Sequence, residues 1–192
     1  MIYIVSTGDM VTGGPETLHQ LAKLYKDQGN DVSMFYVDPH VLTVPERFKI
    51  YDIDVANSIE DSSDNILIVP ETSTYILNKY KKIKVCIWWL SLDNYKRMIP
   101  SNMVRWRAKV HNTPVLLYPV VFLYLLSKKK FHFAYYKFND RDHYYHAYNC
   151  EYAHQFLLSN GIKEEKTIYL CGPLMLRSEL MVVKTADKIR SF

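Results

Sequence analysis

Residues 1–37 read MIYIVSTGDMVTGGPETLHQLAKLYKDQGNDVSMFYV. Residues 2–5 are mostly β-branched and are followed by a polar loop with a glycine, which predicts a buried strand that ends in a loop. Within residues 15–28 the apolar side chains recur every three or four positions, which predicts an amphipathic helix. Residues 31–37 then form a second apolar run. A strand, helix and strand of this length form a right-handed βαβ unit, so the sequence predicts a parallel sheet.

The loop between the first strand and the helix carries Gly13 and Gly14, followed by Pro15 and Glu16. Backbone N–H groups at a helix N-terminus, beside glycines that permit close approach, suit a phosphate, a carboxylate or a sugar hydroxyl. The alternative is a tight turn that binds nothing. A P-loop is excluded because no Gly-Lys-Ser/Thr occurs, and the glycines lack the spacing of a dinucleotide fingerprint. We take Gly13, Gly14 and Glu16 as candidate substrate-binding residues.

Two further buried strands are predicted at residues 66–70 and 85–90, and each is followed by polar residues. Because the carboxyl ends of parallel strands border one crevice, these residues are predicted to meet the same ligand. Alternatively, the residues after the first of these strands only cap a helix. The candidate substrate-binding residues of this region are Glu71, Thr72, Trp89, Ser91 and Asn94.

Asp93 is the one acid between Lys79 and Lys130. We take it as the candidate catalytic residue, a general base that removes the proton of an acceptor hydroxyl. A salt bridge with Lys96 or Arg97 explains this acid equally well. The neighbouring pair of tryptophans at 88 and 89 should point to opposite faces of a regular strand, so at most one of them faces a substrate.

Three segments, taken in order, carry a family resemblance. They are GGPE at 13–16 with the helix after it, IVPET at 68–72 with WWLSLDNY at 88–95, and NCEYA at 149–153, where Cys150 stands in a serine position. Together they resemble the N-terminal, acceptor-side Rossmann-like domain of GT-B glycosyltransferases of capsular and surface polysaccharide synthesis. The resemblance implies an α/β fold with a doubly wound, mostly parallel sheet, a single lobe of a GT-B enzyme. It also implies a saccharide or lipid-linked acceptor.

The nucleotide-sugar donor of those enzymes is held by a second domain. Residues 172–192 are too few for one, since a stable domain usually needs at least about 50 residues. We therefore expect a Rossmann-like domain at 1–171, a short tail at 172–192, and no cofactor bound by this chain, with a nucleotide-sugar donor implied for the completed enzyme. The expected function is the acceptor-binding half of a glycosyltransferase, inactive until a donor-binding subunit or another copy completes it.

Length and composition agree with one globular domain, because 192 residues that are 48% hydrophobic can bury one good core. The first strand follows Met1 directly, with no charged and then apolar leader, which predicts a cytoplasmic protein. Three scattered cysteines are predicted to be buried free thiols. His143, His146 and His154 with Cys150 lack the paired spacing of a metal motif, so no metal is expected.

Positive charge is concentrated in residues 79–130, which we call the basic band. It holds twelve Lys and Arg against one acid, a net charge of +11, which leaves −7 for the rest of the chain. Such a band favours an anionic partner such as lipid head groups, nucleic acid or a phosphorylated substrate. The alternative is a solvated basic face without a partner.

Residues 96–130 of the band enclose an apolar run at 115–126, shorter than the about 20 residues that span a bilayer as a helix. We predict a membrane-interface or partner-docking segment that meets anionic lipid, peripheral on the inner face of the cell membrane. The alternatives are a core element or a contact with another subunit. The residues predicted at the membrane interface are Lys109, Leu116, Phe122, Lys128, Lys129 and Lys130.

A nucleic-acid-binding α/β protein is the second hypothesis, because sixteen tyrosines accompany the basic band and single strands bind to aromatic, basic grooves. Two features count against it. Nucleic acid has no need of the long aliphatic run, and no known RNA- or DNA-binding module is present. Nucleic acid is therefore the less favoured partner.

Overall fold

The structure is a computed structural model that describes residues 1–8, 10, 12–128, 136–138 and 141–170. Within these residues one seven-stranded sheet has the order β3-β2-β1-β4-β5-β6-β7, and every neighbouring pair is parallel. The predicted doubly wound, Rossmann-like α/β fold is confirmed. The strands are β1 Ile2–Ser6, β2 Val32–Tyr36, β3 Asp54–Val55, β4 Ile66–Pro70, β5 Lys84–Trp89, β6 Tyr144–Tyr148 and β7 Thr167–Tyr169.

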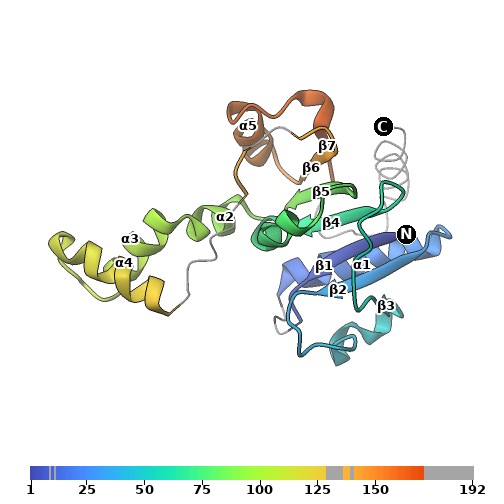
Figure 1. Ribbon diagram of the computed structural model, residues 1–192, viewed down its shortest axis with the longest axis horizontal. Helices are drawn as coiled ribbons and strands as arrows, with labels where there is room; N and C mark the ends of the chain where they lie inside the picture. Colours follow the sequence, from blue (N-terminus) through green and yellow to red (C-terminus); the bar gives the residue numbers. More distant parts are fainter. Residues whose placement is uncertain (9, 11, 129–135, 139–140, 171–192) are drawn as a thin grey trace.

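The helices connect these strands and cover both faces of the sheet (Figure 1). The α-helices are α1 Gly13–Asp27, α2 Leu92–Met98, α3 Pro100–Val110, α4 Tyr118–Ser127 and α5 Glu151–Ser159. Short 3₁₀ helices are η1 Glu46–Tyr51, η2 Glu71–Lys79, η3 Val115–Leu117 and η4 Glu164–Lys166.

Because successive side chains of a strand point to opposite faces of the sheet, the protein has two hydrophobic cores. On one face α1 packs Leu18 and Leu21 against β1 and β2, and on the other η2, α2 and α5 cover β1, β4, β5 and β6. Trp88 belongs to the first core and Trp89 to the second, and both are buried. This confirms the predicted opposite orientation of the two tryptophans.

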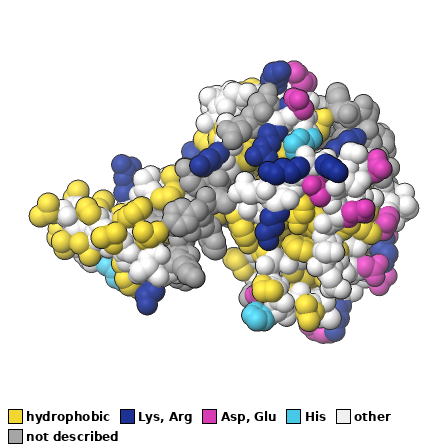
Figure 2. Space-filling view, viewed as in Figure 1, with side chains coloured by type: hydrophobic (Ala, Val, Ile, Leu, Met, Phe, Trp, Pro, Cys, Tyr) yellow, Lys and Arg dark blue, Asp and Glu magenta, His cyan; other side chains and the backbone are white. Residues whose placement is uncertain are grey.

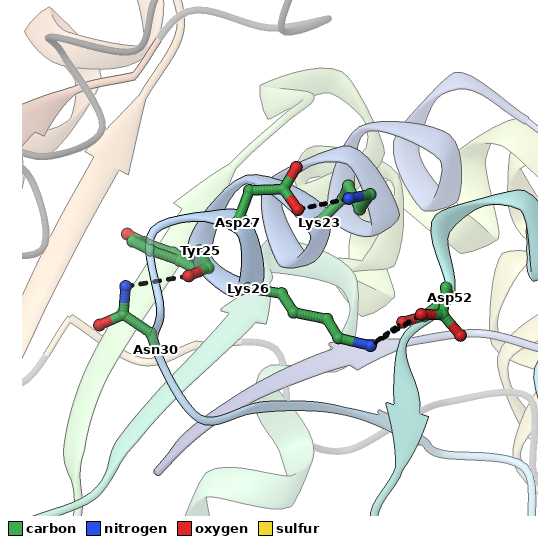
Figure 3. Close-up of polar contacts among 6 residues, drawn as sticks. All are labelled: Lys23, Tyr25, Lys26, Asp27, Asn30 and Asp52. Atoms are coloured by element: carbon green, nitrogen blue, oxygen red, sulfur yellow. Dashed lines mark hydrogen bonds and ion pairs between the residues drawn. The ribbon is translucent and has the colours of Figure 1, made fainter.

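The carboxyl end of α1 is tied down by polar contacts (Figure 3). The Asn30 side-chain amide donates to the carbonyl of Tyr25 at 3.0 Å, and Lys26 Nζ lies 3.1 Å from Asp52 Oδ2 after η1. Gly29 adopts φ +79°, a left-handed conformation that glycine takes without strain and that ends the helix. These contacts tie the carboxyl end of α1 to the end of η1 and to the turn before β2.

Two predicted elements differ. The alternating side chains of residues 47–53 predict a short edge strand, but residues 47–51 lie in η1, and the edge strand is the two-residue β3 that follows. The reason is long-range packing, because the Phe48 ring is fully buried and stacks on His19 of α1 at 4.0 Å between ring centroids. The sequence also predicts a strand or extended segment at 131–136, of which the structure describes Tyr136, whereas β6 was not predicted.

Between β5 and β6 the chain leaves the sheet. Helices α3 and α4 pair antiparallel and project from the sheet domain as one arm (Figure 1). Asn112 takes the left-handed conformation at φ 48° in the turn, and the Thr113 N–H closes it by donating to the carbonyl of Ala108 at 2.8 Å. We call residues 100–127 the helical hairpin.

Candidate functional site

A cavity of about 640 Å³ lies where the strand order reverses, outside the carboxyl ends of β1 and β4. Open α/β sheets bind ligands at this topological switch point. The loops after β1, β2, β4 and β5 line this cavity together with the start of α1. We call it the switch-point cavity.

Five of the residues predicted to bind substrate line the switch-point cavity, namely Gly14, Glu71, Thr72, Ser91 and Asn94. They come from three separate loops, so the prediction that these loops share one crevice is confirmed. Ser91 also caps α2, where its Oγ accepts the N–H of Asn94 at 3.3 Å. The sequence analysis missed Thr12, Asp38 and Ser73, which line the same cavity. Asp38 follows β2 in the chain, so the rule that found Glu71 also finds it.

The predicted substrate contacts Trp89 and Glu16 are not among the described residues that line the switch-point cavity. Trp89 is 0% exposed in the core on the far face, and its Nε1–H donates to His146 Nδ1 at 3.1 Å. Glu16 lies on the side of α1 that faces η1, where it accepts a hydrogen bond from the Tyr51 hydroxyl and pairs with Arg47 at 3.5 Å. Gly13 is the first residue of α1 and adjoins the cavity lining without being part of it.

Asp93 is exposed on α2 and is not among the described residues that line the cavity. The alternative salt bridges to Lys96 and Arg97 do not form within the described part of the chain. Lys96 instead donates to the Tyr152 hydroxyl and lies over its ring. The catalytic role of Asp93 stays a prediction.

Glu71 is the buried carboxylate of the site, with 2% of its surface exposed. Its Oε2 accepts the Leu90 N–H at 3.0 Å, and the Leu90 carbonyl accepts the Asn149 side-chain amide at 3.1 Å. This chain of contacts joins the loops after β4, β5 and β6. Burial raises the pKa of Glu71 to about 7, although hydrogen bonds from its own N–H and those of Leu90 and Ser91 act to lower it. The carboxyl can therefore gain or lose a proton near neutral pH.

Ser73 is the hydroxyl of the cavity that has no partner inside the described protein. The side chain is 1% exposed, and its Oγ makes no hydrogen bond with any described residue. Buried polar groups nearly always find a partner in the protein, in water or in a ligand. Ser73 lines the cavity, but its Oγ is itself buried, so a ligand there would reach this hydroxyl only after the side chain rotates.

The polar lining is acidic and hydroxylated. It includes the carboxylates of Asp38 and Glu71, the hydroxyls of Thr72 and Ser91, and the Asn94 amide, while the described lining residues include no Lys, Arg or His. A phosphate is normally held by cationic side chains together with backbone N–H groups. The lining therefore suits an uncharged, hydroxyl-rich ligand better than a nucleotide or a sugar phosphate.

We expect Gly13→Ala and Gly14→Ala each to stabilise the fold by about 0.5 kcal/mol, because glycine loses more backbone entropy on folding than alanine. A Cβ at Gly13 would meet nothing within 4 Å, and one at Gly14 only Leu90 Cδ1 at 3.9 Å. Urea unfolding measures the change. Gly8→Ala is the opposed control, because its Cβ would lie 2.3 Å from Val41 Cγ2 and should destabilise the fold. A loss of stability in both helix variants would contradict the open space described here.

The basic band does not form one surface. Lys81, Lys82 and Lys84 lie at the amino end of β5, opposite the cavity edge, where the N–H groups of the first two donate to Asp61. Arg105 and Lys109 lie on the helical hairpin. The continuous basic groove that the nucleic-acid hypothesis needs is therefore divided in two.

The apolar run at 115–126 is not a core element, because within it Leu125 is the one buried residue. Lys109, Leu116, Phe122 and Lys128 of the predicted membrane interface are all exposed, whereas Lys129 and Lys130 lie outside the described residues. No helix in the described ranges combines the length and the apolarity that crossing a bilayer requires.

Two of the three cysteines lie within the described residues. Cys86 is buried, and burial raises the pKa of its thiol to about 12. Cys150 is exposed at the start of α5, so its predicted burial is wrong, and Cys171 lies outside the described residues. In the part of the chain that the structure describes, no three His, Cys, Asp or Glu side chains gather as a metal site.

Comparison of the chain with protein-family models, curated proteins and solved structures gave no match.

Proposed function

We propose that this chain is the acceptor-binding lobe of a GT-B glycosyltransferase of surface polysaccharide synthesis, and that the switch-point cavity holds the acceptor sugar. The observation that carries the proposal is the cavity lining, where the described residues bring carboxylates and hydroxyls together without a cationic side chain. The unpaired hydroxyl of Ser73 supports it, because a rotation of this lining side chain would offer the hydroxyl to a sugar. Two of the segments that resemble the family, around Gly14 and Glu71, border this cavity.

Glu71 is the side chain best placed to act on the acceptor. In the proposed reaction an acceptor hydroxyl attacks the anomeric carbon of the donor, its O–H bond breaks, and the proton passes to the Glu71 carboxylate. The bond from the anomeric carbon to the nucleotide breaks at the same time, and the nucleotide leaves with that electron pair. A pKa of about 7 suits a base that works near neutral pH. Asp93 lies outside the cavity lining and is the less favoured base.

The donor belongs to a second lobe. A nucleotide sugar carries a diphosphate, which the acidic lining of the switch-point cavity would repel. The proposal therefore places the donor site on a partner subunit or on a domain outside the described residues, and this lobe performs no transfer alone.

The proposal predicts that uncharged saccharides bind this chain and that nucleotides do not. Saturation-transfer NMR with hexoses, N-acetylhexosamines and their disaccharides measures the first, and UDP and pyrophosphate are the negative probes. Ser73→Ala and Thr72→Val each remove one hydroxyl from the lining, so each should weaken saccharide binding by about five- to tenfold. Ser73→Ala should not lower stability much, because Ser73 Oγ has no partner among the described residues.

Ser58→Ala is the matched control, because this exposed serine lies in the segment that leads to the amino end of β4, on the opposite edge of the sheet. It should leave binding unchanged. UDP binding that Thr72→Val abolishes would contradict the proposal, and so would equal saccharide binding by the Ser73→Ala and Ser58→Ala proteins.

A further inference from the structure

The helical hairpin has an apolar surface that the described protein leaves uncovered. Tyr118, Val121 and Leu125 of α4 lie at spacings of three and four and pack against Met103 and Val104 of α3. If α4 were an ordinary amphipathic helix, its apolar surface would be limited to this packed face. Instead, α4 is apolar on all sides. A helix that is hydrophobic all round is normally buried on all sides. The outer side of α4 is therefore built for a second apolar environment.

That outer side forms an apolar patch around the end of the arm. Leu116 is 88% exposed, and the other large apolar side chains of the patch are between 39% and 73% exposed. They are Val110, Val115, Val120, Phe122 and Leu123. Figure 2 shows hydrophobic side chains covering the projecting arm, with Lys and Arg at its margins. Soluble monomers rarely expose contiguous apolar patches of this kind, so the patch marks a contact surface.

The charge of the arm distinguishes two possible partners of the apolar patch, a second copy of the hairpin and an anionic membrane. Residues 96–128 carry six Lys and Arg and no acid. A second hairpin would bring like charges together, which disfavours a symmetric contact through this arm. Anionic phospholipid complements both features at once, because its head groups pair with the cations and its acyl region accepts the apolar tip.

A second cavity at the base of the arm has the same chemistry. It measures about 450 Å³ and is lined by Arg97, Arg107 and Lys128 together with apolar residues that include Met98 and Trp106. Cationic side chains beside apolar ones suit a lipid phosphate with the start of its acyl chain. The cavity therefore extends the lipid-binding chemistry from the tip to the base.

The dimensions fit insertion into one leaflet. The ten residues of α4 make a helix of about 15 Å, about half the thickness of a bilayer hydrocarbon core of about 30 Å. We infer that the helical hairpin is a membrane anchor that inserts its apolar tip into anionic phospholipid while the cavity at its base holds a lipid head group. This goes beyond the proposed function and does not depend on it.

The test is flotation of the full chain with phosphatidylglycerol–phosphatidylcholine vesicles and with pure phosphatidylcholine vesicles. The wild type should float with the anionic vesicles. Leu116→Glu with Leu123→Glu should weaken binding about tenfold or more, because two apolar side chains no longer enter the acyl region. Arg97→Gln with Lys128→Gln should weaken binding to anionic vesicles roughly fivefold per cation removed and leave binding to neutral vesicles unchanged.

Leu42→Glu with Ile50→Glu is the matched control, because both residues are highly exposed and lie on the sheet domain, away from the arm. It adds the same charge and should float like the wild type. All substituted apolar positions are exposed, so unchanged thermal melts would show that the variants fold.

Trp106 gives a second readout in the unmodified protein. The protein has three tryptophans. Trp106 on α3 is 55% exposed, whereas Trp88 and Trp89 are fully buried. Anionic vesicles should therefore shift the emission to shorter wavelength, and Trp106→Phe should abolish that shift. Equal flotation of tip and control variants would overturn the inference. An emission wavelength that does not change with vesicles would also overturn it. A third contrary result is a wild-type dimer in sedimentation velocity that Leu116→Glu with Leu123→Glu abolishes, while no protein floats with vesicles.

Discussion

Trp89→Ala is expected to destabilise the protein by about 3–5 kcal/mol, the range found when a buried tryptophan is truncated in a packed core. The indole packs edge-on against Tyr95 at 5.0 Å between ring centroids and stacks on Phe138 at 5.6 Å. The same change removes the hydrogen bond from its Nε1–H to His146. Urea unfolding of the variant and the wild type measures the loss.

Trp106→Ala is the matched control, since it removes the same side chain from a half-exposed site on the helical hairpin. Its loss should be about 0.5–1 kcal/mol, as for surface substitutions. Equal losses in the two variants would contradict the placement of Trp89 in the core. Near-full stability of Trp89→Ala with lost saccharide binding would instead restore the substrate contact that the sequence predicted.

Glu71→Gln is expected to remove a pH dependence of stability worth about 3 kcal/mol. The pKa of this carboxyl is raised from 4.5 to about 7 in the folded protein, so between these values the folded state holds a proton that the unfolded state has released. Stability contributed by this proton is fully present below about pH 4.5 and is lost as the pH rises through about 7. Each pKa unit corresponds to about 1.4 kcal/mol.

The measurement is the free energy of unfolding of wild type and Glu71→Gln across this pH range. Subtracting one free energy of unfolding from the other removes the contributions of all other titrating groups. As the pH rises, the difference should increasingly favour the glutamine variant. Glu165→Gln, on the exposed turn before β7, controls for the loss of one carboxylate from the net charge. A flat difference between about pH 4.5 and 7 would show that burial does not hold the proton on Glu71.

Local pattern was sufficient to predict the sheet and much of the cavity. Residues 2–5 and 66–70 are apolar runs of strand length, and the chain after each parallel strand must turn at the same edge, so Glu71, Ser91 and Asn94 were placed together correctly. The central βαβ unit is likewise local, because α1 is specified by its own apolar spacing and by the glycine at its end.

Long-range partners explain what the sequence could not predict. The Tyr51 hydroxyl, 35 positions away in η1, donates a hydrogen bond to Glu16. This contact holds the Glu16 side chain against η1 and not in the cavity. The run at 115–126 shows no helical periodicity because both sides of α4 are apolar, so nothing in the pattern distinguishes an exposed arm from a core element. The orphan hydroxyl of Ser73 depends on which atoms surround it, and no local pattern encodes that.

An amide chemical-shift titration of the full chain tests whether the switch-point cavity binds the acceptor. The ligand is an uncharged disaccharide that binds in the saturation-transfer experiment. We predict saturable shifts at the N–H groups of Gly14, Thr72, Ser73 and Ser91, which border the switch-point cavity, and none across the helical hairpin at 100–127. Shifts confined to other parts of the chain, or the same cavity shifts produced by UDP, would contradict the account of this cavity as an acceptor site.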